Sequence, residues 1–252
     1  MPLVLLHVTP HIVAVLVVLT CATLIRSVFG FGEALVAVPL LALIMPIETA
    51  APLATLVSIT VAALVLVQDW SEVHVRSAGW LVLSTLLGIP LGLLLLTKVS
   101  EPIVKAVLGS IIVAFSLYSL LSRRSHVLAD DRLAWFFGFS AGVLGGAYSM
   151  NGPPLAIYGS LRAWTPQQFR ATLQGYFLPA SMLVMGGYWL AGLWTATVTR
   201  YYLLSLPAVV IAVIAGSVVN RRVHPQRFQF LIYAVLAVVG MVLLVQSVHR
   251  PR

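Results

Sequence analysis

The sequence predicts an all-α integral membrane protein built from two inverted repeats. Of its 252 residues, 60% are hydrophobic and only 9% are charged, whereas a soluble domain carries about 25% charged residues. Several apolar runs reach the roughly 20 residues that a helix needs to cross the hydrocarbon core. Two shorter runs follow similar glycine-rich stretches that lie about half a sequence apart. Each repeat is therefore expected to hold about four spanning helices and one short broken or re-entrant half-helix.

Ten apolar segments are predicted between the charged residues. The second and seventh are 12 and 10 residues long, which is too short to span as helices. Each follows a glycine break, so each is interpreted as a half-helix or as one arm of a re-entrant hairpin. The other eight are long enough to span, or nearly so. The ten segments lie near 11–28, 34–45, 48–67, 77–97, 103–121, 133–148, 152–161, 171–191, 201–219 and 228–248.

The order of features in the first half of the chain recurs in the second. Gly32 precedes Pro39 by seven residues, as Gly146 precedes Pro153. Later in each half, a glycine and then a proline precede the final apolar segment. This agreement favours a duplication over chance similarity between leucine-rich helices. The expected divisions are a first transmembrane repeat at 1–121, a cytoplasmic link at 122–132 and a second transmembrane repeat at 133–252.

Basic residues in the loops predict the orientation, because Lys and Arg gather on the cytoplasmic side of a membrane protein. If each half has five segments and successive loops alternate sides, nine basic residues lie on one side and five on the other. If the two segments at each glycine break instead formed one crossing, the same residues would divide seven and seven. The nine are Arg76, Arg123, Arg124, Arg132, Arg162, Arg170, Arg221, Arg222 and Arg227, and the five are Lys98, Lys105, Arg200, Arg250 and Arg252. The excess predicts inverted repeats with both termini outside the cytoplasm.

Composition also narrows the function. The net charge of +8 is explained by this loop bias, so we expect no nucleic-acid partner. Cys21 is the single cysteine, and the six histidines are scattered, so we assign no disulfide, no metal and no cofactor. No serine, cysteine or histidine constellation suggests catalysis, and an enzyme is not expected.

Arg26 and Glu33 are the only formally charged residues between His11 and Met45, and they flank the first glycine motif. An ionisable side chain in the hydrocarbon costs roughly 2.5–3.5 kcal/mol on insertion scales, so such residues normally face a cavity or one another. One interpretation is an ion pair that holds the unwound turn in place. The other gives Arg26 the binding of an anionic substrate and Glu33 the uptake and release of a proton. The two interpretations are compatible.

The glycine-rich breaks are candidate anion sites. Glycine at the start of a short helix leaves free N–H groups at the positive end of the helix dipole. Gly32 and Gly152 are expected to open the two half-helices, with Ser149 and Asn151 adding side-chain donors beside the second. Close helix packing is the alternative role for such glycines. The site is favoured for those beside prolines and polar residues, which are Gly30, Gly32, Gly145, Gly146 and Gly152.

Arg170 and Gln174 stand four residues apart at the start of the eighth segment, so they are expected on one helix face. Arg170 suits either a substrate contact or a cytoplasmic end charge that extends to the interface. Gln174 lies one turn deeper, and we expect it to contact the substrate.

The duplicated turns also carry a family resemblance that covers nearly the whole chain. They run from Gly30-Phe31-Gly32 to Pro39-Leu40-Leu41, and from Gly145-Gly146 to Gly152-Pro153-Pro154-Leu155. In these motifs the chain resembles the TauE/SafE family of sulfite exporters. The resemblance implies an inner-membrane carrier of small sulfur-containing or organic anions such as sulfite, thiosulfate and sulfonates.

Together these features predict a secondary transporter, in the direction of export, for a small anion such as sulfite or an organosulfonate. Alternating access would operate around the two helix breaks, with protons as the candidate coupling ion. An anion channel and a carrier of a small carboxylate remain alternatives. The expected partners are the small anion, protons and membrane lipid, and a homodimer is left open.

Overall fold

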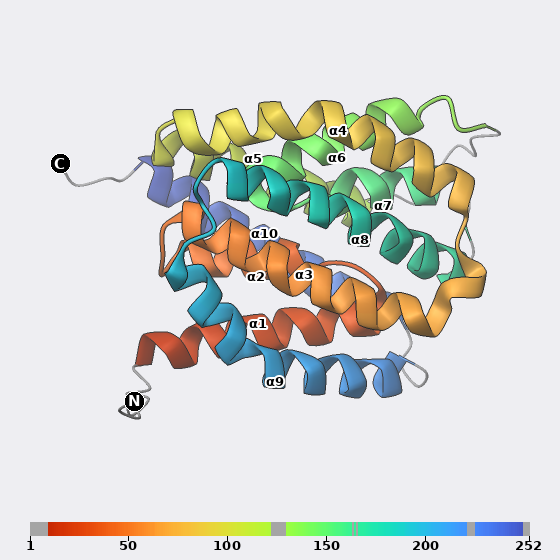
Figure 1. Ribbon diagram of the computed structural model, residues 1–252, viewed down its shortest axis with the longest axis horizontal. Coiled ribbons are helices and arrows are strands. Elements are labelled where there is room, and N and C mark those ends of the chain that lie inside the picture. Colours follow the sequence, from red (N-terminus) through yellow and green to blue (C-terminus); the bar gives the residue numbers. More distant parts are fainter. Residues whose placement is uncertain (1–9, 122–129, 163, 165, 221–224, 249–252) are drawn as a thin grey trace.

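The computed structural model is all-helical and describes residues 10–121, 130–162, 164, 166–220 and 225–248 (Figure 1). Each predicted segment corresponds to one of ten α-helices in these ranges, and the 3-10 helix η1 (Trp70–Glu72) follows the third. The α-helices are α1 (Pro10–Phe29), α2 (Glu33–Ala42), α3 (Ile47–Asp69), α4 (Val75–Lys98), α5 (Glu101–Leu121), α6 (Ala134–Tyr148), α7 (Gly152–Leu161), α8 (Pro166–Leu190), α9 (Ala196–Asn220) and α10 (Pro225–Val248).

Two helices begin five residues earlier than their apolar segments predict. Helix α8 begins at Pro166, and proline suits the first helical position because its φ is already helical. Helix α9 begins after Thr195, whose hydroxyl accepts a hydrogen bond from the N–H of Val198 at 3.3 Å, as a capping residue does. The segments were bounded at charged residues, whereas the helices begin at residues that favour a helix start.

Four helical stretches of the described residues are long and apolar enough to cross a membrane. They are Pro10–Phe29, Ile47–Glu72, Val75–Lys98 and Ala196–Val219. Large apolar side chains face outward on these and neighbouring helices, among them Leu87 on α4 and Ile211 on α9. Such an apolar exterior would aggregate in water and matches a hydrocarbon surround.

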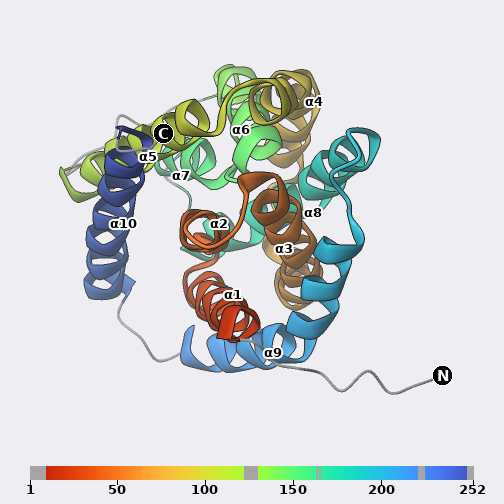
Figure 2. The same cartoon turned by 90° about the vertical axis from the view of Figure 1, so that its left-hand side faces the viewer.

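Helix α2 lies near the centre of the bundle (Figure 2) and contacts α1, α3 and α10. Eight of its ten residues are buried. Around it, α4 packs on α6, α5 on α10, α1 on α9 and α3 on α8. The shortest apolar helix of the first half is thus held among longer ones, and its first residue, Glu33, is buried in protein.

A polar network ties together one end of the molecule, where α3 ends and α8 begins. The carboxylate of Asp131 accepts hydrogen bonds from the hydroxyls of Tyr158 (2.6 Å) and Ser77 (2.9 Å), and it lies 3.5 Å from the guanidinium of Arg162. Burial alone would raise the pKa of Asp131. The two hydrogen bonds and the positive charges of Arg162 and Arg76 outweigh burial and hold that pKa below its usual value.

Candidate functional site

The first helix break lies between α1 and α2 and depends on two glycines. Gly30 and Gly32 have φ values of 83° and 100°, which residues with a Cβ rarely adopt. Gly30 also lies against α8, where an added Cβ would come within 2.9 Å of Cγ of Arg170. The chain therefore turns sharply here and allows α8 to approach its backbone closely.

The second break lies between α6 and α7 and uses a serine in place of a glycine. Ser149 has a φ of 57° and is the one described residue other than glycine with a positive φ. The N–H groups of Ser149 and Met150 bond back to the carbonyls of Gly145 (2.9 Å) and Leu144 (3.1 Å). These bonds satisfy the last carbonyls of α6 and hold Ser149 in a conformation that costs about 1–3 kcal/mol.

The two half-helices differ in the backbone donors that they offer. Helix α2 starts immediately after Gly32, and its first backbone hydrogen bond joins the N–H of Val36 to the carbonyl of Gly32 at 3.2 Å. The preceding N–H groups are those that a helix leaves without an intrahelical acceptor. Helix α7 starts at Gly152 and continues with Pro153 and Pro154, which have no N–H. The first break is thus the richer source of backbone donors.

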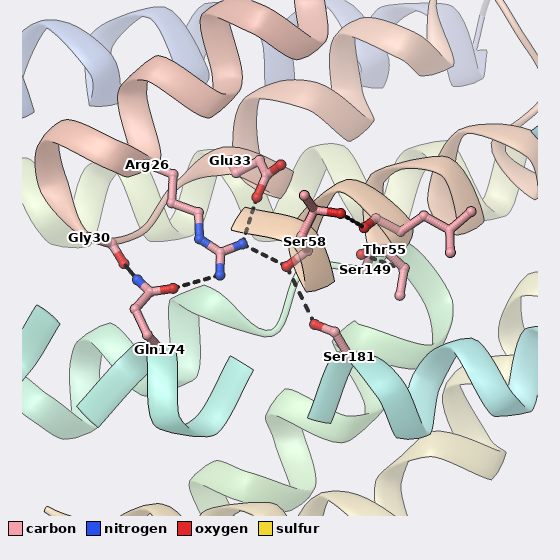
Figure 3. Close-up of polar contacts among 10 residues, drawn as sticks. Arg26, Gly30, Glu33, Thr55, Ser58, Ser149, Gln174 and Ser181 are labelled. Carbon is pink, nitrogen blue, oxygen red and sulfur yellow. Dashed lines mark hydrogen bonds and ion pairs between the residues drawn. The ribbon is translucent and has the colours of Figure 1, made fainter. Parts of the chain in front are cut away.

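Arg26 on the last turn of α1 is the centre of the polar site (Figure 3). Its Nη1 donates to the carboxylate of Glu33 and to the hydroxyl of Ser58, both at 2.6 Å, and its Nη2 donates to Oε1 of Gln174 at 2.7 Å. The ring of Phe177 lies under the guanidinium, with 4.7 Å between Cζ and the ring centroid. One buried guanidinium therefore connects α1, α2, α3 and α8.

Gln174 links this arginine to the first break. Its side-chain amide donates to the carbonyl of Gly30 at 2.5 Å while its oxygen accepts from Arg26. Arg170, one turn earlier on α8, instead places its Nε 2.9 Å from the carboxylate of Asp69 at the end of α3. The two residues share a helix face, but only Gln174 reaches Arg26.

Both breaks border one small cavity of about 20 Å³. Arg26, Glu33 and Gly32 line it from the first break, and Asn151 and Gly152 line it from the second. A cavity needs roughly 10–15 Å³ to hold one water molecule, so this space accommodates a water but no larger ligand without movement of its walls. Its remaining lining comes from Ala34, Leu35, Ser58, Met150 and Phe177.

The charged pair keeps unused hydrogen-bonding capacity. Arg26 and Glu33 are only 3% and 1% exposed. Nε of Arg26 nevertheless has no hydrogen-bond partner among the described residues, and the hydroxyl of Thr23 lies near the Glu33 carboxylate without a well-aligned hydrogen bond to Oε1. A buried polar atom without a partner costs about 1–3 kcal/mol, and more where the group is charged. The pair is therefore not arranged for stability alone.

Gly145 and Gly146 lie in the last turn of α6, next to the second break but with different neighbours. The carbonyl of Gly145 accepts a hydrogen bond from the hydroxyl of Tyr188 at 3.0 Å. A Cβ on Gly146 would lie 2.6 Å from the carbonyl oxygen of Ile89 on α4. Gly145 is thus tied to α8, whereas Gly146 allows α4 and α6 to pack closely.

Five polar or aromatic residues of this region were not found from the sequence. Ser58 and Phe177 contact Arg26, Ser181 lies 3.4 Å from Ser58, Thr55 lies 2.7 Å from the hydroxyl of Ser149, and Tyr188 bonds Gly145. A signal for three of them was present. Phe177, Ser181 and Tyr188 follow Gln174 by three, seven and fourteen residues, which is the spacing of one helix face.

A buried ion pair at the point where two broken helices meet, inside a bundle with an apolar exterior, is the arrangement of a membrane transporter. Residues 15–243 match the family model described as Sulfite exporter TauE/SafE. The chain belongs to this family, as its duplicated turns predict, and is therefore a membrane transporter of the sulfur-anion type. No curated protein and no solved structure matches it.

The positive φ of Gly30 yields a first prediction. Gly30→Ala should destabilise the protein by about 1–3 kcal/mol, because alanine is strained at this φ and its Cβ would displace Arg170. The measurement is the melting temperature in detergent. Gly79→Ala on α4 is the matched control, since a Cβ there meets nothing within 4 Å. Equal melting temperatures for the two variants would contradict the assignment of Gly30.

The inner ion pair yields a second prediction. Arg26→Ala should cost about 3–5 kcal/mol, because it leaves the carboxylate of Glu33 buried without a partner. The double variant Arg26→Ala/Glu33→Ala should lose less stability than Arg26→Ala alone. Denaturation in detergent measures both, and additive losses would show that the two side chains are not coupled. The exposed pair Arg132–Asp130 is the control, with an expected coupling below about 1 kcal/mol.

Proposed function

We propose that this protein is a secondary transporter that exports sulfite or a related organosulfonate by alternating access around the two helix breaks. The observation that carries the proposal is the cavity where both breaks meet Arg26 and Glu33. The guanidinium joins four helices, but well-packed apolar side chains of similar volume often replace a buried ion pair without loss of stability, so stability alone does not explain a charge in this position. It is suited to bind an anion at membrane depth.

The donors around the cavity match an oxyanion. The guanidinium of Arg26 suits bidentate binding of an oxygen pair, and the start of α2 presents backbone N–H groups. Ser58 and the amide of Asn151 add neutral donors from α3 and from the second break. Several donors on different elements suit a compact anion with three oxygens, which can accept from more than one side.

Glu33 occupies the position on Arg26 that a substrate anion would take. Its carboxylate lies 2.6 Å from Nη1, and a carboxylate resembles a sulfonate group in its negative charge and in its closely spaced oxygens. Two anions beside one guanidinium would leave a net negative charge in a site screened from water. Displacement of Glu33 by substrate is therefore coupled to the uptake of a proton on Glu33, which makes proton coupling part of the proposal.

Inverted repeats fit the packing of the helices. In two repeats of five helices, each helix corresponds to the helix five places away in the chain. The counterpart of the α4–α6 pair is then α9–α1, and the counterpart of the α4–α8 pair is α9–α3. The pairs α3–α8 and α5–α10 are their own counterparts. All of these pairs pack in the structure. In Figure 1, α1 begins and α10 ends at the same end of the molecule. The divisions 1–121, 122–132 and 133–252 are accordingly proposed as repeat, link and repeat.

The orientation in the membrane follows from the end of the molecule opposite to the one where α1 begins and α10 ends. Arg76, Arg132, Arg162 and Arg170 belong to the end that also carries Asp69 and Asp131. An end rich in arginine favours the cytoplasmic side, so we place it there, with the protein in the inner membrane and both termini outside the cytoplasm. An anion channel would share the site but would carry large, unsaturable currents in planar bilayers, whereas a transporter gives slow and saturable flux.

Arg26 should control substrate affinity. Sulfite or a small sulfonate should raise the melting temperature of the purified wild-type protein, because a ligand that binds the folded state stabilises it. Arg26→Lys should weaken binding by at least about tenfold, since hydrogen bonds to charged groups contribute about 1.5–3 kcal/mol. Arg132→Lys is the control. An unchanged affinity in Arg26→Lys, or stabilisation by carboxylates but not by sulfur oxyanions, would overturn the substrate assignment.

Glu33 should set the pH dependence. If binding is accompanied by proton uptake on Glu33, affinity for methanesulfonate, which stays ionised, should increase as pH falls, by up to about tenfold per pH unit. Glu33→Gln should abolish this slope and tighten binding, because the competing carboxylate is gone. Calorimetric titration between pH 5 and 8 measures both effects. A slope that persists in Glu33→Gln would remove the proton role from this residue.

A further inference from the structure

A second arginine–carboxylate pair lies one helical turn from the site, toward the arginine-rich end. Asp69 is the last residue of α3, and Arg170 precedes Gln174 by four residues on α8. Four residues correspond to about 6 Å along a helix axis. Arg26–Glu33 is called the inner pair below, and Asp69–Arg170 the outer pair.

The two pairs are graded in burial. Arg26 and Glu33 are 3% and 1% exposed, whereas Arg170 and Asp69 are 13% and 32% exposed. Cα, Cβ and Cγ of Arg170 lie against Gly30 of the first break. Arg170 therefore lies between the first break and the water at this end of the molecule.

The outer pair does not have the features of a structural anchor. Asp69 is held by Arg170 alone in the described part of the chain, whereas Asp131 at the same end is held by two hydroxyls and a guanidinium. Asp69 also ends α3, where the helix dipole is unfavourable for a negative charge. A partly hydrated ion pair of this kind contributes only about 0–1 kcal/mol, so another anion can replace its carboxylate readily.

We propose that Arg170 forms an outer subsite for the transported oxyanion, with Asp69 as its resident competitor. The carboxylate neutralises Arg170 when no anion is present, and an arriving anion displaces it before moving one turn inward to Arg26. The inference rests on the proposed function, because it assigns a second position on the path of the same anion. No covalent step is involved.

The test compares sulfite flux in inside-out and right-side-out membrane vesicles. Asp69→Asn removes the competitor and should lower KM by about two- to fivefold, the equivalent of a partly exposed ion pair. Arg170→Gln should raise KM by at least about tenfold, and Asp69→Asn should have no effect in the Arg170→Gln background. These changes should occur only for sulfite supplied at the face that carries Arg170. Equilibrium affinity at the inner site should stay within about twofold of the wild-type value.

A purely structural ion pair gives the opposite sign. In that case Asp69→Asn would lower the melting temperature and raise KM, which would overturn the proposal, as would an unchanged KM. Asp69→Ser repeats the test if Asp69→Asn does not fold. Asp130→Asn, which breaks the exposed Asp130–Arg132 pair at the same end, is the matched control and should leave KM unaltered.

The outcome separates this inference from the proposed function. If sulfite does not stabilise the wild-type protein at any concentration tested, the transport proposal itself fails. If sulfite stabilises the wild-type protein but Asp69→Asn and Arg170→Gln leave KM unchanged, only the outer subsite is disproved.

Discussion

The guanidinium of Arg26 is the interaction on which the arrangement of the bundle centre depends. It is nearly inaccessible to water, and its contacts come from three other helices, α2, α3 and α8. An arginine at membrane depth is tolerated only if its donors meet acceptors. That requirement fixes the end of α1 relative to the start of α2, and it fixes both relative to α3 and α8. The helix break is needed for the same reason, since a continuous helix would carry Glu33 two turns beyond Arg26 and out of its reach.

The two breaks reach a similar geometry by different chemistry. The first relies on glycines at positive φ and leaves backbone donors at the start of α2. The second places Ser149 in a left-handed conformation and has two prolines directly after Gly152, the first residue of α7, so it offers few backbone donors. Its contribution to the cavity is neutral, through Asn151 and Gly152. The charge of the site therefore resides almost entirely in the first half of the chain, although both halves line the cavity.

The sequence was informative about breaks and charges and much less informative about neighbours. Arg26 and Glu33 were identifiable because charge is rare in an apolar run, and Gly30 and Gly32 because glycine at that position implies a turn. Thr55 and Ser58 were not, since hydroxyl residues are common in membrane helices and only the packing of α3 on α8 places these two beside the breaks. Gly146 is the opposite case, because the sequence assigned it to the site and the structure shows a packing role. A glycine in a helix break and a glycine in a helix contact cannot be distinguished in the sequence, and only the position of α4 against Gly146 separates them.

The role of the inner pair, Arg26–Glu33, can be inferred from its incompletely satisfied hydrogen-bonding atoms. A buried ion pair optimised for stability would fill its remaining lone pairs and N–H groups with partners. Within the described chain, Nε of Arg26 has no partner, and Oε1 of Glu33 has no well-aligned one. An apolar replacement of similar volume would often be as stable or more so. The cost is intelligible if the carboxylate is a temporary occupant, held well enough to neutralise the arginine and loosely enough to be displaced. The outer pair, Asp69–Arg170, is the same kind of pair one turn outward and is more hydrated. In the proposed path, each arginine is neutralised by a carboxylate until an anion arrives. Neither arginine then has to be exposed as a bare charge in the membrane.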